Sequence, residues 1–233
     1  MQPNLRDRAL ILAEAALAQA GTRTTPRGIH WLNAAMNYVN TGHWMAKHGF
    51  RDAARVWGRD HIFDDLARRV QDERVLYMEF GVWQGSCTRY WSAALRNPAS
   101  LLHGFDSFEG LPQNWTVKMP KGHFSTNGSL PALADPRVTF YPGWFSDTFQ
   151  RYEWPSQYDR ILAVIDCDLY SSTVDVLSFL EPHLRPAALL YFDEFNYASD
   201  EQRAFSEFID RTGLKFNVVL ARLEYGKVAF ELA

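Results

Sequence analysis

Residues 161–173 read ILAVIDCDLYSST: five apolar residues, two aspartates two positions apart, and then three hydroxyl side chains. The apolar run predicts a strand buried on both faces, as in a parallel sheet covered by helices. Ser171, Ser172 and Thr173 are residue types that cap helices, so we expect a helix to begin where the strand ends. Asp166 and Asp168 would then lie at the carboxyl end of a central strand, where open α/β sheets bind ligands.

A second segment repeats this arrangement, because residues 187–194 (AALLYFDE) form another apolar run that ends in two acids. Carboxyl ends of parallel strands meet at one edge, and carboxylates gathered there are costly unless a cation or a proton compensates them. Oxygen ligands suit a hard cation, so we expect Asp166, Asp193 and Glu194 to bind Mg²⁺ or another divalent cation. Asp168 could act as the general base. The alternative is that these acids cap helices or pair with arginines; two acid pairs on adjacent strands favour the metal.

The rest of the main domain alternates strands with helices. This order predicts an α/β fold with a mostly parallel sheet of seven strands, closed by an antiparallel C-terminal hairpin. The further strands are expected at residues 75–80, 101–105, 137–141, 215–220 and 227–231, and the helices at 86–95, 144–152, 172–184 and 200–212.

The first seventy residues are read as an N-terminal helical extension (1–70) that precedes the main domain (71–233). Residues 5–20 are rich in Ala and Leu and predict a helix that ends at Gly21. Residues 22–49 suggest short helices and loops whose aromatic rings pack on the main domain, or cover a substrate or contact another copy. A further helix is expected at residues 53–69.

Composition limits the class of protein. The chain has 233 residues and a formal charge of −3, which gives no basic field for nucleic acid. No apolar run approaches the ~20 residues of a membrane span, and the start does not resemble a signal peptide. Cys87 and Cys167 make no disulfide framework, so we expect reduced thiols and a cytoplasmic protein without nucleic-acid or membrane partners. A homo-oligomer is compatible with the aromatic N-terminal region.

The first strand-turn-helix unit carries a candidate cofactor site. Gly81 and Gly85 lie in the turn, but without the G-x-G-x-x-G spacing that holds a pyrophosphate. Glu79 before the turn suits a positively charged cofactor, and Asp106 after the next strand is placed to accept hydrogen bonds from a ribose. Together they point to S-adenosylmethionine. Residues 107–129 form a long segment with aromatic rings, which is typical of a lid.

At this point the motifs resemble a known family. The runs EFGVWQGS (79–86), HGFDSFEGLP (103–112), GWFSDT (143–148), IDCDLYSST (165–173) and FDEF (192–195) are similar to those of the macrocin O-methyltransferase family. Its members are metal-dependent enzymes that methylate sugar hydroxyls, and the chain is similar in kind to mycobacterial enzymes that methylate methylmannose oligosaccharides. Here the double glycine of the family's first loop is replaced by Gln84 and Gly85.

The resemblance implies a class I methyltransferase sheet of the Rossmann-like kind and a role for each matching segment. The metal ligands would again be Asp166, Asp193 and Glu194, with a base at or near Asp168. The cofactor contacts implied by the three glycine-containing loops are Glu79, Phe80, Gly81, Gly85, Ser86, Asp106, Ser107, Phe108, Gly143, Trp144 and Phe145.

Three functions remain open on the sequence. The first is Mg²⁺-dependent methyl transfer from S-adenosylmethionine to a hydroxyl of a saccharide or glycoside, with His123 as an alternative base to Asp168. The second keeps the fold and the cofactor but takes a catechol or another phenol. The third is a catalytically silent module that binds the cofactor or a sugar; the full set of four acids argues against it, because a binder needs no metal and base together.

Overall fold

The computed structural model of the chain describes residues 5–116 and 118–233; residues 1–4 of the expected extension and residue 117 of the expected lid lie outside them. Its centre is one sheet of eight strands in the order β1-β7-β8-β6-β5-β2-β3-β4. The strands are β1 (Arg55–Val56), β2 (Val75–Phe80), β3 (Leu101–Asp106), β4 (Val138–Pro142), β5 (Arg160–Ile165), β6 (Leu189–Phe192), β7 (Phe216–Arg222) and β8 (Val228–Leu232).

The sheet confirms the expected fold class, since β1 with β7 and all pairs from β6 to β4 are parallel, and only β8 runs against its neighbours β6 and β7. Strands β2 and β6 are buried along their whole length, as their apolar runs require. The expectation of seven strands was wrong by one. The additional strand, β1, has two residues, which is too short to produce a periodic pattern.

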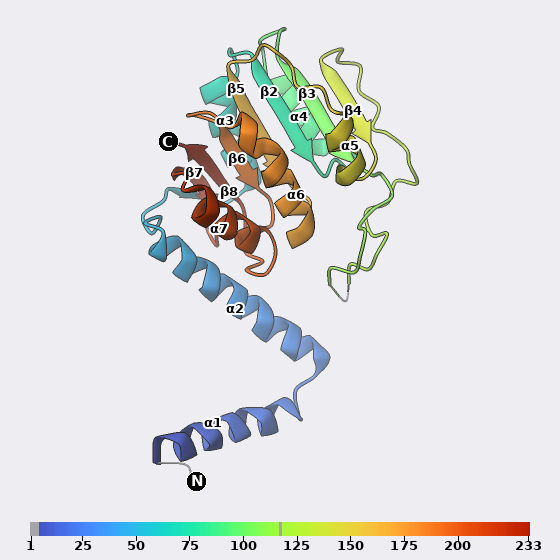
Figure 1. Cartoon of the computed structure of the whole chain (residues 1–233). Helices are drawn as coiled ribbons and strands as arrows, with labels where there is room; N and C mark the ends of the chain where they lie inside the picture. Colours follow the sequence, from blue (N-terminus) through green and yellow to red (C-terminus); the bar gives the residue numbers. More distant parts are fainter. Residues whose placement is uncertain (1–4, 117) are drawn as a thin grey trace.

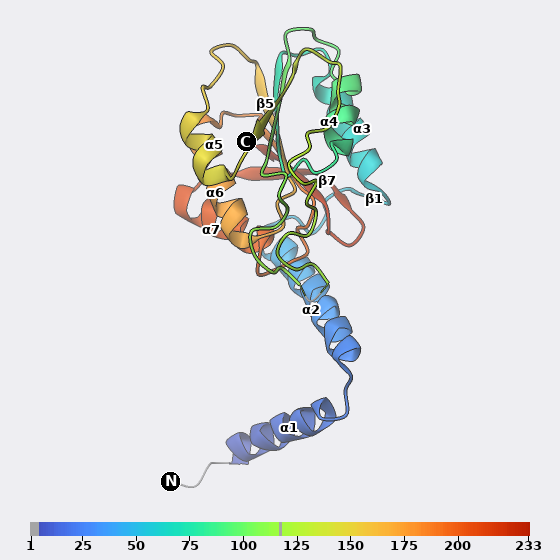
Figure 2. The same ribbon diagram turned by 90° about the vertical axis from the view of Figure 1, so that its right-hand side faces the viewer.

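Helices cover both faces of the sheet (Figures 1 and 2). On one face lie α3 (Arg59–Val70) and α4 (Ser86–Ala94), and their Phe63 and Trp91 pack with Tyr77 and Tyr191 of the sheet. On the other face lie α5 (Phe145–Arg151), α6 (Tyr170–Leu180), the 3-10 turn η1 (Glu181–His183) and α7 (Glu201–Thr212). Every strand-helix alternation expected after residue 75 is therefore present, with bounds that differ by at most a few residues.

The N-terminal helices differ from expectation. The first, α1 (Leu5–Gly21), is where the sequence placed it, but residues 22–49 form one long helix, α2 (Pro26–Lys47), rather than short helices and loops. The Thr25 side chain caps α2 by accepting a hydrogen bond from the Gly28 amide at 3.1 Å. The helix expected over 53–69 begins only at Arg59, since the residues before it include β1. The boundary at residue 70 stays a prediction.

The two helices leave the body of the molecule. Figures 1 and 2 show α2 leading away from the sheet and α1 at its far end. Only the C-terminal part of α2 is anchored, where Thr41, Trp44 and Met45 are buried. None of the described helices is long and apolar enough to span a bilayer.

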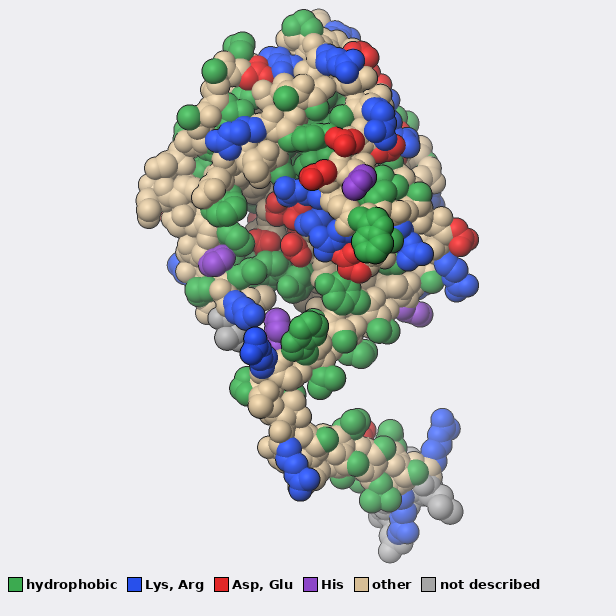
Figure 3. Space-filling model, turned by 180° about the vertical axis from the view of Figure 1, so that it is seen from behind, with side chains coloured by type: hydrophobic (Ala, Val, Ile, Leu, Met, Phe, Trp, Pro, Cys, Tyr) green, Lys and Arg blue, Asp and Glu red, His purple; other side chains and the backbone are tan. Residues whose placement is uncertain are grey.

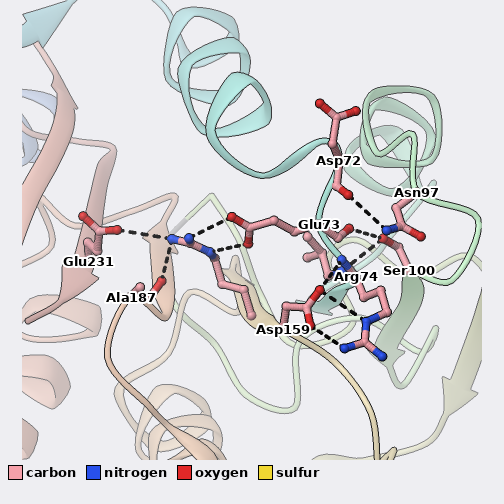
Figure 4. Close-up of polar contacts among 10 residues, drawn as sticks. Asp72, Glu73, Arg74, Asn97, Ser100, Asp159, Ala187 and Glu231 are labelled. Atoms are coloured by element: carbon pink, nitrogen blue, oxygen red, sulfur yellow. Dashed lines mark hydrogen bonds and ion pairs between the residues drawn. The ribbon is translucent and has the colours of Figure 1, made fainter.

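A polar network holds the amino end of the sheet (Figure 4). Arg160 at the start of β5 donates to both carboxylate oxygens of Glu73, at 2.7 and 2.9 Å, and to the carbonyl oxygen of Ala187 at 3.1 Å. It also donates to Glu231 of β8 at 3.3 Å. Arg74 pairs with Asp159 at 2.6 Å on the exposed side. Glu73, Glu231 and Asp159 therefore each have a guanidinium partner.

Candidate functional site

A cavity of about 620 Å³ opens at the opposite, carboxyl edge of the sheet. Its walls come from the segments that follow β2, β3, β4, β5 and β6, which topology brings to one edge. The long segment after β3 contributes Leu111, Trp115 and Phe124, so the expected lid lies against the cavity. Figure 3 shows a hollow in the rear face of the molecule where acidic side chains gather beside basic ones.

Most of the residues expected in the site line this cavity. They are Glu79, Gly81, Ser86, Asp106, Ser107, Gly143, Trp144, Phe145, Asp166, Asp168, Asp193 and Glu194. Three expected cofactor contacts, Phe80, Gly85 and Phe108, do not line it. Phe80 and Phe108 are buried in the fold, and Gly85 is buried where α4 begins, next to Pro131. His123, the alternative base, is likewise not among the lining residues, and its ring packs edge-on against that of Phe124.

The turn after β2 is shaped by Gly81. Its φ of +93° lies in the region that only glycine adopts readily, and a Cβ there would lie 1.8 Å from the carbonyl oxygen of Asp166. The Asp166 amide donates to the carbonyl oxygen of Phe80 at 2.9 Å. The glycine thus lets the turn after β2 approach the acids after β5 closely.

Glu79 lies at the base of the cavity and is 1% exposed. One carboxylate oxygen, Oε2, accepts hydrogen bonds from the Tyr77 hydroxyl at 2.7 Å and from the Thr88 hydroxyl at 2.6 Å. Burial raises the pKa of Glu79 to about 7, although both hydrogen bonds act to lower it. A cationic ligand in the cavity would favour the ionised form.

Asp106 organises the backbone of the same turn. Its Oδ2 accepts from the amides of Val82 and Trp83, at 2.8 and 2.7 Å, and its Oδ1 accepts from the Phe108 amide at 2.7 Å. The carboxylate therefore joins the ends of β2 and β3. Because each carboxylate oxygen can accept more than one hydrogen bond, capacity for a ribose hydroxyl remains on Oδ1.

Asp166 and Asp168 stand together at the end of β5. Burial, then the charges of Asp193 and Asp168, raise the pKa of Asp166 well above its usual range. Burial and the neighbouring Glu194 raise the pKa of Asp168 to about 8. Asp168 also has a left-handed backbone, with φ of +62°, in a buried position. Aspartate tolerates this conformation better than most residues, but it still costs about 1–2 kcal/mol, a strain typical of functional sites.

Asp193 differs from the other acids because two cations already face it. Lys227 donates to its carbonyl oxygen at 3.0 Å and to its Oδ2, and Arg59 lies 3.6 Å from Oδ1. The Tyr191 hydroxyl donates to Oδ1 at 2.6 Å. Burial alone would raise the pKa of Asp193, but the Lys227 ammonium and these hydrogen bonds lower it.

Glu194 and Glu201 complete the acidic wall. Burial and Asp193 raise the pKa of Glu194 to about 7, against the influence of Lys227. Glu201 is buried; its Oε2 accepts from the Glu194 amide at 3.0 Å, and its Oε1 is a buried atom without a hydrogen-bond partner among the described residues. Acidic groups thus outnumber basic groups around the cavity at this edge of the sheet.

With this geometry in place, the comparison with known families is decisive. Residues 58–224 match the macrocin O-methyltransferase family (TylF). The chain belongs to this family.

Individual relatives agree with that assignment. A tetracenomycin methyltransferase of Streptomyces olivaceus, "8-demethyl-8-(2,3-dimethoxy-alpha-L-rhamnosyl)-tetracenomycin-C 4'-O-methyltransferase", is 33% identical, with 59% of this chain and 59% of that protein aligned. Mycinamicin III 3''-O-methyltransferase of Micromonospora griseorubida is 27% identical, with 61% of this chain and 63% of that protein aligned. The aligned region thus spans about three fifths of the length of these curated relatives.

Solved structures share the fold. The calicheamicin methyltransferase CalS11 superposes with a TM-score of 0.60 at 22% identity, covering 90% of this chain and 94% of its own. The O-methyltransferase NovP has a TM-score of 0.57 at 21% identity, covering 73% and 78%. This macrocin O-methyltransferase family protein therefore has the class I methyltransferase fold.

The expected metal ligands fit a hard cation in chemistry but not in arrangement. Asp166, Asp193 and Glu194 line one cavity and offer carboxylate oxygens under mutual repulsion, which a divalent cation would relieve. Within residues 5–116 and 118–233, however, no three His, Cys, Asp or Glu side chains are grouped closely enough to hold a metal ion. Lys227 lies against Asp193 instead.

Sequence reasoning missed the cationic side of the site. Lys227 directly precedes β8, and since β8 runs antiparallel to β6, its start faces the end of β6. The expected antiparallel C-terminal hairpin therefore already implied that Lys227 lies near the acids after β6. A second signal was the pattern Tyr-x-acid, which occurs at Tyr77–Glu79 and again at Tyr191–Asp193. Residues two apart on a strand share a face, so each tyrosine reaches its acid. Arg59 had no comparable signal, because it comes from α3, outside the motif-bearing segments.

Proposed function

We propose that this protein transfers a methyl group from S-adenosylmethionine to a hydroxyl of a sugar on a glycosylated metabolite, with the help of a divalent cation such as Mg²⁺. The observation that carries the proposal is one cavity of about 620 Å³ that joins a buried acid and a glycine turn on one side to a cluster of acids on the other. Family membership and two relatives, a rhamnosyl-tetracenomycin methyltransferase and a mycinamicin methyltransferase, support the substrate class.

The cofactor would occupy the side of the cavity formed by the turns after β2, β3 and β4. The ionised form of Glu79 suits the positive charge of S-adenosylmethionine, and Asp106 can accept from its ribose. Ser86, Ser107, Gly143, Trp144 and Phe145 complete this wall. A structure with the same fold, an O-methyltransferase from Bacillus cereus, holds S-adenosylhomocysteine, which supports the cofactor assignment.

The acceptor hydroxyl would be activated on the acidic side. Asp166, Asp193 and Glu194 are the residues that would hold the cation; because their side chains are not grouped closely enough for this in the described structure, they would have to move together when it binds. When bound, the cation would supply a Lewis acid that lowers the pKa of a nearby hydroxyl. Asp168, whose pKa is raised to about 8 by burial and by Glu194, would accept the hydroxyl proton. The oxygen would then attack the methyl carbon in line with the departing sulfur, and fixed orientation would provide much of the rate.

The test is release of S-adenosylhomocysteine from S-adenosylmethionine in the presence of free sugars, rhamnosylated glycosides and catechols, each with Mg²⁺ and with EDTA. We expect turnover on a glycoside that EDTA abolishes. Asp168→Asn should keep cofactor binding and lower kcat by at least about a hundredfold, the contribution typical of a general base. Asp175→Asn, which changes another carboxyl of the same cavity, is the matched control.

Each contrary result would overturn a different part of the proposal. Turnover only on catechols would move the substrate class to phenols, and metal-independent turnover would remove the cation from Asp166, Asp193 and Glu194. Full activity of Asp168→Asn would give the base role to another residue. Cofactor binding without turnover on any acceptor would favour a silent binding module.

A further inference from the structure

The N-terminal arm, residues 5–47, exposes an unusual amount of apolar surface. Every α1 residue whose burial is described is exposed, including Leu10, Leu12 and Leu17 at 60%, 71% and 75%. Figure 3 shows hydrophobic side chains standing along this arm, away from the body of the molecule. Helical segments in proteins gain most of their stability by packing an apolar face, and none of the α1 side chains that the structure describes is buried against its own domain.

The exposed side chains of α2 follow a heptad. Ile29, Leu32, Met36 and Val39 are spaced by three, four and three residues, which corresponds to successive a and d positions of a coiled coil. They are 42%, 60%, 55% and 63% exposed. Leu10 and Leu17 of α1 are likewise seven residues apart. A strict a/d seam is the pattern that packs against another helix of the same kind rather than against a sheet.

The area also fits a specific partner. Six large hydrophobic side chains lie on the α1 and α2 stripes and are each more than two fifths exposed: Leu10, Leu17, Ile29, Leu32, Met36 and Val39. At roughly 100 Å² each, one arm presents about 600 Å² of apolar stripe, and two arms together about 1,200 Å². This reaches the largest apolar patches that monomers usually expose, about 300–600 Å², and the lower end of the range of stable protein–protein interfaces, about 1,200–2,000 Å².

We propose that residues 5–47 form a pairing arm that packs against the same arm of a second copy of this chain. The α2 seam makes the central contact, and α1 extends it. The interface is isologous, since the same apolar stripe serves on both copies.

The arm is joined firmly to the domain, so pairing would also fix the position of the two domains. Trp44 packs edge-on against Phe195 with ring centroids 5.1 Å apart, and its indole donates to Ser206 at 3.1 Å. Thr41 donates to the carbonyl oxygen of Asn196 at 3.5 Å. Phe195 and Asn196 directly follow Glu194 at the cavity edge of the sheet, and Ser206 lies on α7.

The test is the mass of the full chain in solution, measured by sedimentation velocity and by light scattering over a wide concentration range. We expect wild type at twice its 26.8 kDa. Leu32→Glu combined with Met36→Glu should raise the dimer dissociation constant at least about a hundredfold and yield a monomer. Leu10→Glu with Leu17→Glu tests the α1 contact separately. Glutamate is a good helix former, so the substitutions do not oppose the helix by themselves, and a loss of far-UV circular dichroism larger than the arm helices can account for would indicate a misfolded domain.

The matched control is Leu130→Glu, a similarly exposed leucine outside the arm, which should remain dimeric. A wild-type monomer at all concentrations would overturn the proposal, and so would a Leu32→Glu/Met36→Glu protein that associates as wild type does. A wild-type monomer that sediments with phosphatidylcholine vesicles would assign the arm to a lipid surface and also overturn it.

Discussion

Replacing Glu79 with glutamine should make the folded protein more stable above neutral pH. The pKa of Glu79 rises from its ordinary 4.5 to about 7, chiefly through burial. The folded state therefore binds this proton more tightly than the unfolded state does. The contribution of the Glu79 carboxyl to the free energy of unfolding is complete below pH 4.5 and is lost as the pH rises through about 7. The complete loss is about 3 kcal/mol, at 1.36 kcal/mol for each unit of pKa.

The measurement is urea unfolding at pH 5 and pH 8, followed by tryptophan fluorescence. Between these two values wild type should lose about 2.5 kcal/mol more free energy of unfolding than Glu79→Gln. Glutamine can still accept from Tyr77 and Thr88, so the hydrogen bonds to one oxygen persist. Glu153→Gln, an exposed carboxyl on the loop after α5, should behave as wild type.

Equal pH dependence of wild type and Glu79→Gln would refute the reasoning, because it would mean that Glu79 ionises in the folded protein as readily as in water. The same titration links stability to the proposed cofactor. Affinity of wild type for S-adenosylmethionine should increase with pH up to about 7, by up to about tenfold per pH unit. The affinity of Glu79→Gln for S-adenosylmethionine should be lower and should not show this increase with pH.

Three further changes test other parts of the structure. Arg160→Leu should lower the free energy of unfolding by about 2 kcal/mol, because Glu73 and Glu231 lose their partner, as urea unfolding would measure. Gly81→Ala should cost about 3 kcal/mol or more in the same assay, because its Cβ would meet the Asp166 carbonyl oxygen. Lys227→Met should tighten Mn²⁺ binding to the protein at least about tenfold in isothermal titration, since it removes a positive charge beside Asp193.

Each of these three substitutions has a control variant or a result that would contradict it. Arg203→Leu breaks an exposed ion pair on α7 and should cost at most about 0.5 kcal/mol; an equal cost at Arg160 would mean that the network does not stabilise the sheet. Gly128 has a similar positive φ of +75° but open space around it, so Gly128→Ala isolates the backbone strain from the steric contact. Unchanged Mn²⁺ affinity in Lys227→Met would show that the lysine does not compete for the site.

The sequence predicted the buried strands correctly because the pattern that identifies such a strand lies within a few consecutive residues. A strand covered on both faces must be apolar along its length, so β2, β5 and β6 could be read directly, and the acids that follow them had to reach one edge. Helix α2 could not be read in the same way, because its apolar stripe faces away from the domain and its only buried residues are at its C-terminal end. Its continuity depends on packing that a periodic core pattern does not reveal.

The site was predictable only on its acidic side. Acids at strand ends follow from topology, whereas Arg59 comes from the start of α3 and Lys227 from the residue before the antiparallel strand β8. The role of Asp106 was also more structural than expected, since its oxygens first satisfy three amides of the turns. Side-chain partners of this kind depend on distances that sequence spacing does not fix.

The two ends of the sheet differ in how the charges of their acids are compensated. At the amino end, Arg160 and Arg74 neutralise the acids beside them, so that end contributes stability. At the carboxyl end, burial raises the pKa of Glu79, Asp166 and Asp168, and the folded protein is less stable for each of them above neutral pH. A bound cation can offset this loss of stability, because it favours the ionised form of a buried carboxyl. A cationic cofactor beside Glu79 and a divalent ion beside Asp166 would both do so, and their binding should therefore raise the thermal midpoint more at pH 8 than at pH 6.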